Sequence, residues 1–254
     1  MSGGLDGLLA RRGLRDLPLA RRRMRARVAG LGVPSRILDA MDAVPRHAFV
    51  PAAYWRLAYA ESGLWLPSGA SLPAPEATAR ILTALDPGDG DRLLEIGTGT
   101  GYLAALLGCL GGSVLTLDDA DLTDGALAAA RLTGVRQVAD GGPAEWQPEA
   151  PFDGILLSRP VPVPPVEMVV RCRRLVAVVG SSPGPCRLLL ARAGDAEARV
   201  TDLGPLIVPT PAMARAVSGG ASPASWPEGD SGLEGGVALE GGAGGAATWE
   251  GPGT

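Results

Sequence analysis

The spacing of apolar residues in the first third of the chain predicts two helices. Apolar side chains recur there at intervals of three and four in two runs: Ile37, Leu38, Met41 and Val44, then Ile81, Leu82 and Leu85. Such intervals are typical of amphipathic helices, and Pro45 ends the first one. Residues 63–75 between the runs, GLWLPSGASLPAP, are rich in Gly, Pro and Ser and predict a loop or a short hairpin.

From residue 92 onward, short apolar runs of strand length alternate with helical stretches. Strands are predicted at 92–98, 113–119, 135–140, 152–158 and 173–180, and helices at 102–110, 122–134 and 165–172. This alternation predicts an α/β fold with a mostly parallel sheet and helices on both faces. The last two apolar runs, 186–193 and 197–209, have no helix between them, so we expect an antiparallel C-terminal hairpin at the sheet edge.

The two ends of the chain differ in charge and composition from the middle. Residues 1–34 contain eight arginines against two aspartates, whereas residues 215–254 are mainly Gly, Ala, Ser, Pro and acids. A basic end suits nucleic acid, an acidic partner or a solvated helix face. Because no aromatic residue is present there to stack on bases, we favour the solvated face and expect no nucleic-acid partner. We predict a basic extension over 1–34, a globular domain over 35–214 and a disordered tail over 215–254.

No segment has the pattern of a membrane span or a secretion signal. A spanning helix needs about 18 or more consecutive apolar residues, and the arginine-rich start lacks the apolar core of a signal peptide. The scattered cysteines Cys109, Cys172 and Cys186 form no CxxC pair, so no metal site is predicted. We therefore expect a cytoplasmic protein without a bound metal or a membrane partner.

The most distinctive stretch is LLEIGTGTGYLAALL, residues 93–107, which joins a predicted strand to a predicted helix. Ligands of open parallel sheets bind at the carboxyl ends of the strands, where glycines let the backbone approach them closely. The dinucleotide pattern G-x-G-x-x-G is not met, because Tyr102 stands where its third glycine should be. A phosphate-binding loop needs a Gly-Lys pair, and the chain has no lysine.

The form ExGxGxG resembles the S-adenosylmethionine site of Rossmann-like methyltransferases, whose cofactor carries no phosphate. The resemblance implies cofactor contacts from the run itself: Glu95, Gly97, Thr98, Gly99, Gly101 and Tyr102. Glu95 would serve the amino acid end of the cofactor, directly or through water. Asp118, with Asp119 as the alternative, would bind the ribose hydroxyls, and Asp140 with Gly141 would lie near the adenine.

Together with its flanking segments, the run resembles the protein-L-isoaspartate O-methyltransferase family. VPRHAFVP, the segment from 58 to 82, ADGG and APFDGILLS follow blocks of that family in order, within roughly residues 21–210. The resemblance implies a Rossmann-like fold with acceptor-side helices and loop at 35–85 and a cofactor-binding core at 86–214. It also implies methyl transfer from S-adenosylmethionine to an aspartyl or isoaspartyl carboxylate of a peptide or protein.

This reaction asks for no general base. A carboxylate has an ordinary pKa of about 4 and is ionised at neutral pH, so it needs to be desolvated and oriented rather than deprotonated. The single histidine, His47, is therefore expected to be structural or at the surface. The methyl ester can then lose methanol when the following backbone N–H attacks its carbonyl, which closes a succinimide (aspartimide).

The acceptor half departs from the family pattern. The family loop reads G-x-x-x-S-x-P and its serine is regarded as an active-site residue, but GASLPAP places Pro73 there. Proline offers neither a hydroxyl nor an N–H, so Ser71 is our candidate catalytic residue, and Ser71 and Leu72 are candidate substrate contacts. The family's TAA after the fourth strand is SRP here, and Arg159 either pairs with a substrate carboxylate or is solvated.

Three functions are consistent with these residues. Pro73, Arg159 and the additional ends favour a specialised enzyme that methylates a chosen aspartate of a peptide, and this is the interpretation we prefer from the sequence. The alternative is a housekeeping enzyme that repairs isoaspartyl residues in damaged proteins. An inactive, regulatory cofactor-binding protein is supported by the lost serine and opposed by the intact cofactor acids.

Overall fold

The computed structural model describes residues 3–118, 134–139, 149–181, 185–194 and 198–211, and among these it leaves out the side chains of 3–15, 118 and 139. Its α-helices are α1 (Gly3–Ala29), α2 (Ser35–Ala43), α3 (Pro75–Leu85) and α4 (Tyr102–Cys109). Short 3-10 helices are η1 (Arg46–Phe49), η2 (Ala52–Tyr54) and η4 (Val166–Arg171). The strands are β1 (Leu64–Trp65), β2 (Ser71–Leu72), β3 (Arg92–Ile96), β4 (Ser113–Asp118), β5 (Val135–Ala139), β6 (Phe152–Val161), β7 (Cys172–Gly180), β8 (Cys186–Arg192) and β9 (Arg199–Leu206).

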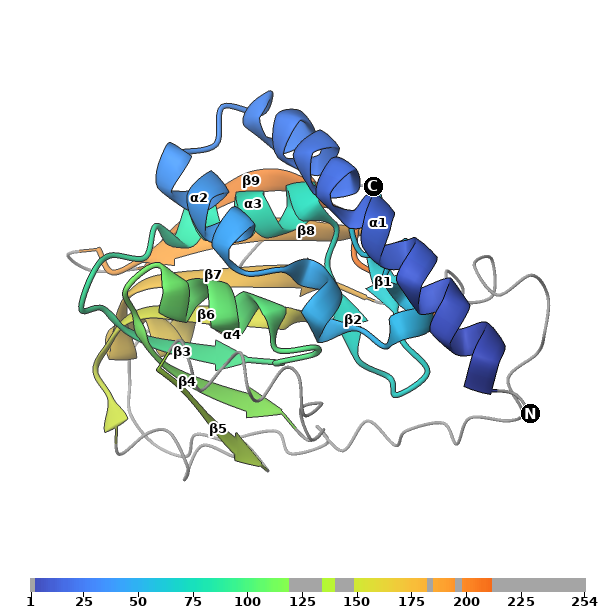
Figure 1. Cartoon of the computed structure of the whole chain (residues 1–254). Coiled ribbons are helices and arrows are strands. Elements are labelled where there is room, and N and C mark those ends of the chain that lie inside the picture. Colours follow the sequence, from blue (N-terminus) through green and yellow to red (C-terminus); the bar gives the residue numbers. More distant parts are fainter. Residues whose placement is uncertain (1–2, 119–133, 140–148, 182–184, 195–197, 212–254) are drawn as a thin grey trace.

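The central sheet has the strand order β5-β4-β3-β6-β7-β8-β9 (Figure 1). Pairing is parallel from β5 to β7 and antiparallel between β7, β8 and β9, which confirms the predicted parallel sheet and its C-terminal hairpin. The predicted hairpin at 63–75 is also confirmed, because β1 pairs antiparallel with β2. The predicted helix at 122–134 and the tail from 215 lie outside the described residues.

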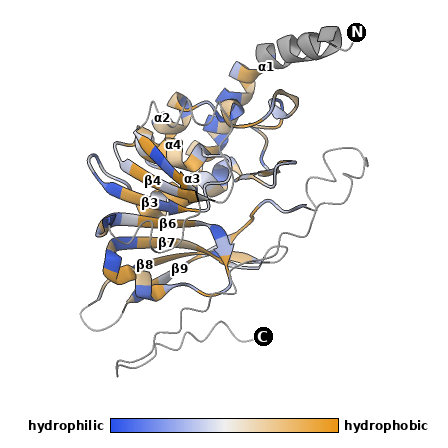
Figure 2. Cartoon of the chain, turned by 90° about the horizontal axis from the view of Figure 1, so that it is seen from below, coloured by the Kyte–Doolittle hydropathy of each residue, from blue (hydrophilic) through white to orange (hydrophobic). Residues whose placement is uncertain are grey.

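The sheet separates two hydrophobic clusters. Alternate residues of the central strands contribute to opposite faces, so that Leu93 belongs to one cluster and Leu94 to the other. Within the described ranges all four α-helices lie on the first face (Figure 2), whereas Val169 of η4 belongs to the second cluster. The expected helix at 165–172 is thus a 3-10 helix, which follows Pro164 and Pro165.

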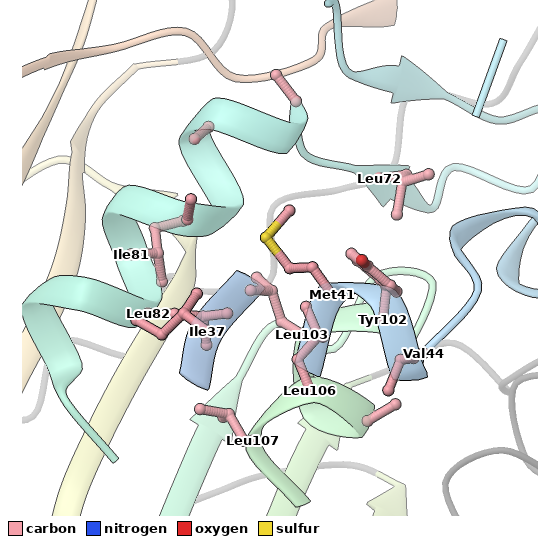
Figure 3. Packing of buried hydrophobic residues seen from close by; sticks show 14 of the residues in the cluster. Ile37, Met41, Val44, Leu72, Ile81, Leu82, Tyr102, Leu103, Leu106 and Leu107 are labelled. Carbon is pink, nitrogen blue, oxygen red and sulfur yellow. The ribbon is translucent and has the colours of Figure 1, made fainter. Parts of the chain in front are cut away.

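Helices α2, α3 and α4 enclose the larger cluster beneath the loop that carries β1 and β2. Figure 3 shows Ile37 and Met41 of α2 next to Ile81 and Leu82 of α3, above Leu106 of α4. These are the helical runs expected from the apolar spacing, and each buries its periodic face. The packing joins the segment before residue 85 firmly to the sheet.

Helix α1 belongs to the same core from its middle onward. Met24 and Val28 are buried against the other helices, and Arg25 donates hydrogen bonds to Asp39 and Asp42 of α2, at 3.0 and 2.5 Å. The predicted domain boundary at residue 34 therefore does not coincide with a break in packing. No helix among the described residues has the length and apolar character needed to cross a membrane.

Candidate active site

The glycine run lies at the carboxyl ends of β3, β4 and β6 and is in contact with all three strands. The backbone N–H of Gly97, the residue after β3, donates to the carbonyl of Leu117 in β4 at 2.9 Å. From the other side, the hydroxyl of Ser158 in β6 donates to the carbonyl of Gly97 at 2.5 Å. The pairing of β6 with β7 shifts between Leu157 and Val161, and this irregularity includes Ser158 and Arg159. The turn is therefore fixed by both neighbouring strands.

The glycines of the turn are required by close contacts as well as by backbone conformation. Gly97, Gly99 and Gly101 all have positive φ, at 96°, 56° and 80°. A Cβ on Gly97 would lie 2.7 Å from the Cβ of Arg159, and one on Gly99 would lie 2.7 Å from the carbonyl oxygen of Ser71. The turn thus brings the backbone of the β3–α4 connection against both β6 and the loop that carries β2.

A buried chain of polar side chains starts at Glu95. Glu95 pairs with Thr116 in the β3–β4 register, and the hydroxyl of Thr116 donates to the Glu95 carboxylate at 2.9 Å. The hydroxyls of Thr116 and Thr98 lie 2.5 Å apart. Because a carboxylate only accepts, the hydroxyl of Thr116 is committed to Glu95, and Thr98 must donate to Thr116. This order leaves the lone pairs of the Thr98 oxygen as acceptors.

The acceptor loop, residues 69–75, forms the other side of the site. The backbone N–H of Thr100 donates to the carbonyl of Ser71 at 3.3 Å. A small cavity of about 10 Å³, room for roughly one water molecule, lies between the loop and the glycine run. It is lined by Ser71, Pro73, Gly97, Thr98, Thr100, Leu103 and Ser158.

A larger hollow of about 880 Å³ lies at the opposite, amino end of the sheet. Its arginines are engaged with its acids: Arg174 pairs with Asp91 at 2.6 Å, and Arg36 pairs with Asp86. None of the residues predicted to act in binding or catalysis lines this hollow. Its size therefore does not make it the functional site.

Several predicted site residues are placed differently from what the sequence suggested. Leu72 and Tyr102 are fully buried in the hydrophobic core (Figure 3), and their contacts with substrate and cofactor stay predictions. Glu95 is also fully buried and reaches the site through Thr116 and Thr98. Asp118 is the last residue of β4, beside the glycine run, but its side chain is outside the description, as are Asp119, Asp140 and Gly141.

Sequence reasoning did not identify Thr116, Thr100 or Ser158 as site residues. Thr116 lies in the middle of a strand that reads as apolar, and only the register with β3 places it opposite Glu95. Ser158 lies in β6 directly after its run of buried residues, toward the carboxyl end of the strand, and this position is the signal that could have identified it. Arg159 is exposed, next to Gly97 at the mouth of the site.

These residues fit S-adenosylmethionine. Its uncharged ribose and adenine need no anion cradle, and its ammonium group needs acceptors, which the Glu95–Thr116–Thr98 chain provides. The left-handed glycines bring the backbone of the turn to the carboxyl ends of the strands, where ligands of such sheets bind. The described residues form one wall of such a site.

Comparisons with known proteins agree with this fit. Residues 24–182 match the family model of protein-L-isoaspartate(D-aspartate) O-methyltransferase. The chain is 38% identical over 171 residues to the protein-L-isoaspartate O-methyltransferase of Methanoculleus marisnigri, covering 65% of this chain and 76% of that protein. It is 36% identical over 176 residues to the enzyme of that name from Methylorubrum populi, covering 67% and 83% of the two chains.

A solved structure supports the same fold. A protein-L-isoaspartate O-methyltransferase superposes with a TM-score of 0.58 at 20% identity, over 75% of this chain and 65% of that one. The methyl donor of the family is S-adenosylmethionine, and its members are carboxyl methyltransferases. The matched residues include the glycine run, the acceptor loop and the strand end that carries Ser158. The chain therefore belongs to the protein-L-isoaspartate(D-aspartate) O-methyltransferase family.

Proposed function

We propose that this protein methylates the free carboxylate of isoaspartyl residues in proteins and so starts their repair. The observation that carries the proposal is the contact between the acceptor loop and the glycine run, through Thr100 and Ser71 at 3.3 Å. An acceptor bound along the loop would thereby lie beside a cofactor bound at the run. The names of the related enzymes support isoaspartyl acceptors over the specialised peptide that the sequence favoured.

The cofactor side of the proposal rests on residues at three strand ends. The Thr98 oxygen would accept from the cofactor ammonium group, with Glu95 holding Thr98 in that role through Thr116. Asp118, or Asp119, would bind the ribose hydroxyls, and Asp140 with Gly141 would lie near the adenine. The cofactor supplies, when bound, an activated methyl group.

The acceptor side has to orient a carboxylate and exclude water from it. In an isoaspartyl residue the chain continues through the side-chain carbonyl, which leaves the α-carboxylate free and, at an ordinary pKa near 4, ionised. Its oxygen forms the new bond to the methyl carbon while the carbon–sulfur bond breaks and the electron pair stays on sulfur. Pro73 cannot donate to this carboxylate, so the hydroxyl of Ser71 and the guanidinium of Arg159 are the donors that we propose.

The proposal is tested by incubating the full chain with cofactor labelled in the methyl group. Three acceptors are compared: an isoaspartyl peptide, its normal aspartyl isomer, and any small precursor peptide encoded beside the gene. Label in the isoaspartyl peptide alone is the expected result. Label in only the aspartyl or the precursor peptide would contradict the proposal and restore the specialised interpretation, which Pro73 and Arg159 favour. Cofactor binding without transfer to any acceptor would mean an inactive protein.

Methyl transfer by Arg159 variants tests its proposed role. Arg159→Ala should raise the KM for the isoaspartyl peptide by roughly tenfold, the range expected for a hydrogen bond to a charged group. Arg159→Lys should raise the KM for the isoaspartyl peptide by less, because the positive charge is kept. Equal kinetics for the wild type and Arg159→Ala would leave Arg159 as a solvated surface residue.

A further inference from the structure

One arginine is completely buried at the junction between the acceptor loop and the cofactor turn. Arg46, the first residue of η1, has a relative exposure of 0% and is the largest fully buried side chain in the described part of the protein. Burial of a guanidinium is costly unless its N–H groups are satisfied, and it lowers the pKa of Arg46. No described carboxylate forms an ion pair with it. Its Nε and Nη2 donate to carbonyl groups, and its Nη1 has no hydrogen-bond partner among the described residues.

The two hydrogen bonds of Arg46 tie separate segments together. Its Nε donates to the carbonyl of Ala58 at 2.6 Å, and its Nη2 donates to the carbonyl of Pro73 at 2.7 Å. The guanidinium also faces the aromatic ring of Tyr102, with Cζ 4.8 Å from the ring centre. Tyr102 is the first residue of α4, directly after the glycine run. A single side chain therefore touches both the acceptor loop and the helix that begins at the cofactor turn.

The bond to Pro73 has a particular consequence for the loop. A proline has one backbone hydrogen-bonding group, its carbonyl, and Arg46 takes that carbonyl while Pro73 also lines the cavity. At the other end of the same stretch, the carbonyl of Ser71 accepts from Thr100 of the glycine run. Leu72 between them is buried in the core. The loop is thus fastened at two carbonyls two residues apart, and Arg46 provides one of the two fastenings.

We propose that Arg46 is a positioning residue that holds Ser71 and Pro73 of the acceptor loop in place beside the glycine run. The glycine run itself is held by other contacts, from Gly97 to Leu117 and from Thr98 to Thr116. Loss of Arg46 should therefore affect the acceptor more than the cofactor. This inference rests on the proposed function, because it assigns acceptor binding to the loop.

The test compares Arg46→Lys and Arg46→Met with the wild type. Lysine keeps the charge, but its single ammonium lacks the rigid fork that reaches both carbonyls, and methionine fills the space without any donor. Arg56→Lys is the matched control, since Arg56 is an exposed arginine that pairs only with Asp16 among the described residues. For both Arg46 variants, kcat/KM for the isoaspartyl peptide should fall by roughly 10- to 100-fold, while the cofactor Kd changes less than about threefold.

Amide hydrogen exchange of the full chain provides a second readout that needs no acceptor. In Arg46→Lys, faster exchange should be confined to residues 70–74 and to the Thr100 amide that bonds Ser71, while the other amides of the glycine run exchange as in the wild type. Unchanged exchange and kinetics in both Arg46 variants would overturn the inference. An equal loss of cofactor affinity and acceptor kcat/KM would also overturn it, because it would indicate a merely structural residue. If the wild type labels no acceptor, the proposed function fails, while the exchange pattern still decides the role of Arg46.

Discussion

The structure explains why glycine is required at two positions of the glycine turn. Gly97 and Gly99 combine a left-handed backbone with contacts that leave no room for a Cβ, one against Arg159 and one against Ser71. The glycine pattern predicted a ligand-binding turn. The sequence could not indicate that these glycines also allow β6 and the acceptor loop to pack closely against the turn. That information depends on the register of strands that lie far apart in the chain.

We predict that Gly99→Ala severely weakens both cofactor binding and methyl transfer. Alanine in a left-handed conformation costs about 1–2 kcal/mol, and its Cβ would also displace the Ser71 carbonyl. Gly32→Ala is the matched control, because Gly32 has a φ of 73° but no atom within 4 Å of the position that a Cβ would take. Calorimetric cofactor binding should distinguish them: both variants lose stability, and only Gly99→Ala loses affinity. Equal cofactor affinities of the two variants would show that the close approach of Gly99 to Ser71 is not required for cofactor binding.

The burial of individual polar residues could not be predicted from the sequence. Arg46 in VPRHAFVP has the appearance of a surface arginine, and Thr116 that of a neutral strand residue. Both are fully buried, because segments remote in sequence supply their partners: Pro73 for Arg46 and Glu95 for Thr116. Leu72 and Tyr102, candidate contacts from the sequence, likewise pack into the core through segments remote in sequence.

Strands and helices were predictable where their apolar period was clear. The parallel sheet, the hairpin of β8 and β9, and helices α2 to α4 follow from apolar spacing that the structure preserves. Helix α1 was expected as a basic extension because its eight arginines dominate its composition. Its residues Leu17, Met24 and Val28 nevertheless face the core. Several of its arginines pair with acids of neighbouring segments, such as Arg25 with Asp42 and Arg27 with Glu76.

We predict that the second half of α1 contributes to the stability of the whole domain. Met24→Ala should lower the free energy of unfolding by about 2–5 kcal/mol, because Met24 is 1% exposed in the core. Leu19→Ala on the same helix should change it by no more than about 0.5 kcal/mol, because Leu19 is 46% exposed. Urea unfolding of both variants measures the difference. Similar midpoints would mean that α1 is a separable extension.

The end of β4 is the element on which the cofactor proposal depends most. Asp118 follows Leu117, whose carbonyl accepts from Gly97, so its backbone lies beside the turn. Asp118→Ala should raise the cofactor Kd by roughly 10- to 100-fold, because ribose hydroxyls would lose an ionised acceptor. Asp119→Ala tests the alternative in the same titration. If neither variant binds more weakly, the ribose assignment is wrong.

At the level of the whole molecule, the sheet brings the glycine run and the acceptor loop together, although they lie in separate parts of the chain. The cofactor turn has the ExGxGxG form, whereas the acceptor loop has Pro73 where the sequence resemblance implied a serine. The fold explains why this exchange is compatible with the structure: the Pro73 carbonyl is held by Arg46, and no N–H is needed there.

The ratio of kcat/KM values for one isoaspartyl peptide and its aspartyl isomer is the sharpest test of methylation at isoaspartyl carboxylates. The product should be identified by mass spectrometry as an α-methyl ester that later loses methanol to form the succinimide. We expect a ratio far above one and an ester on the isoaspartyl carboxylate alone. A ratio at or below one, or an ester found only on the aspartyl side chain, would contradict it.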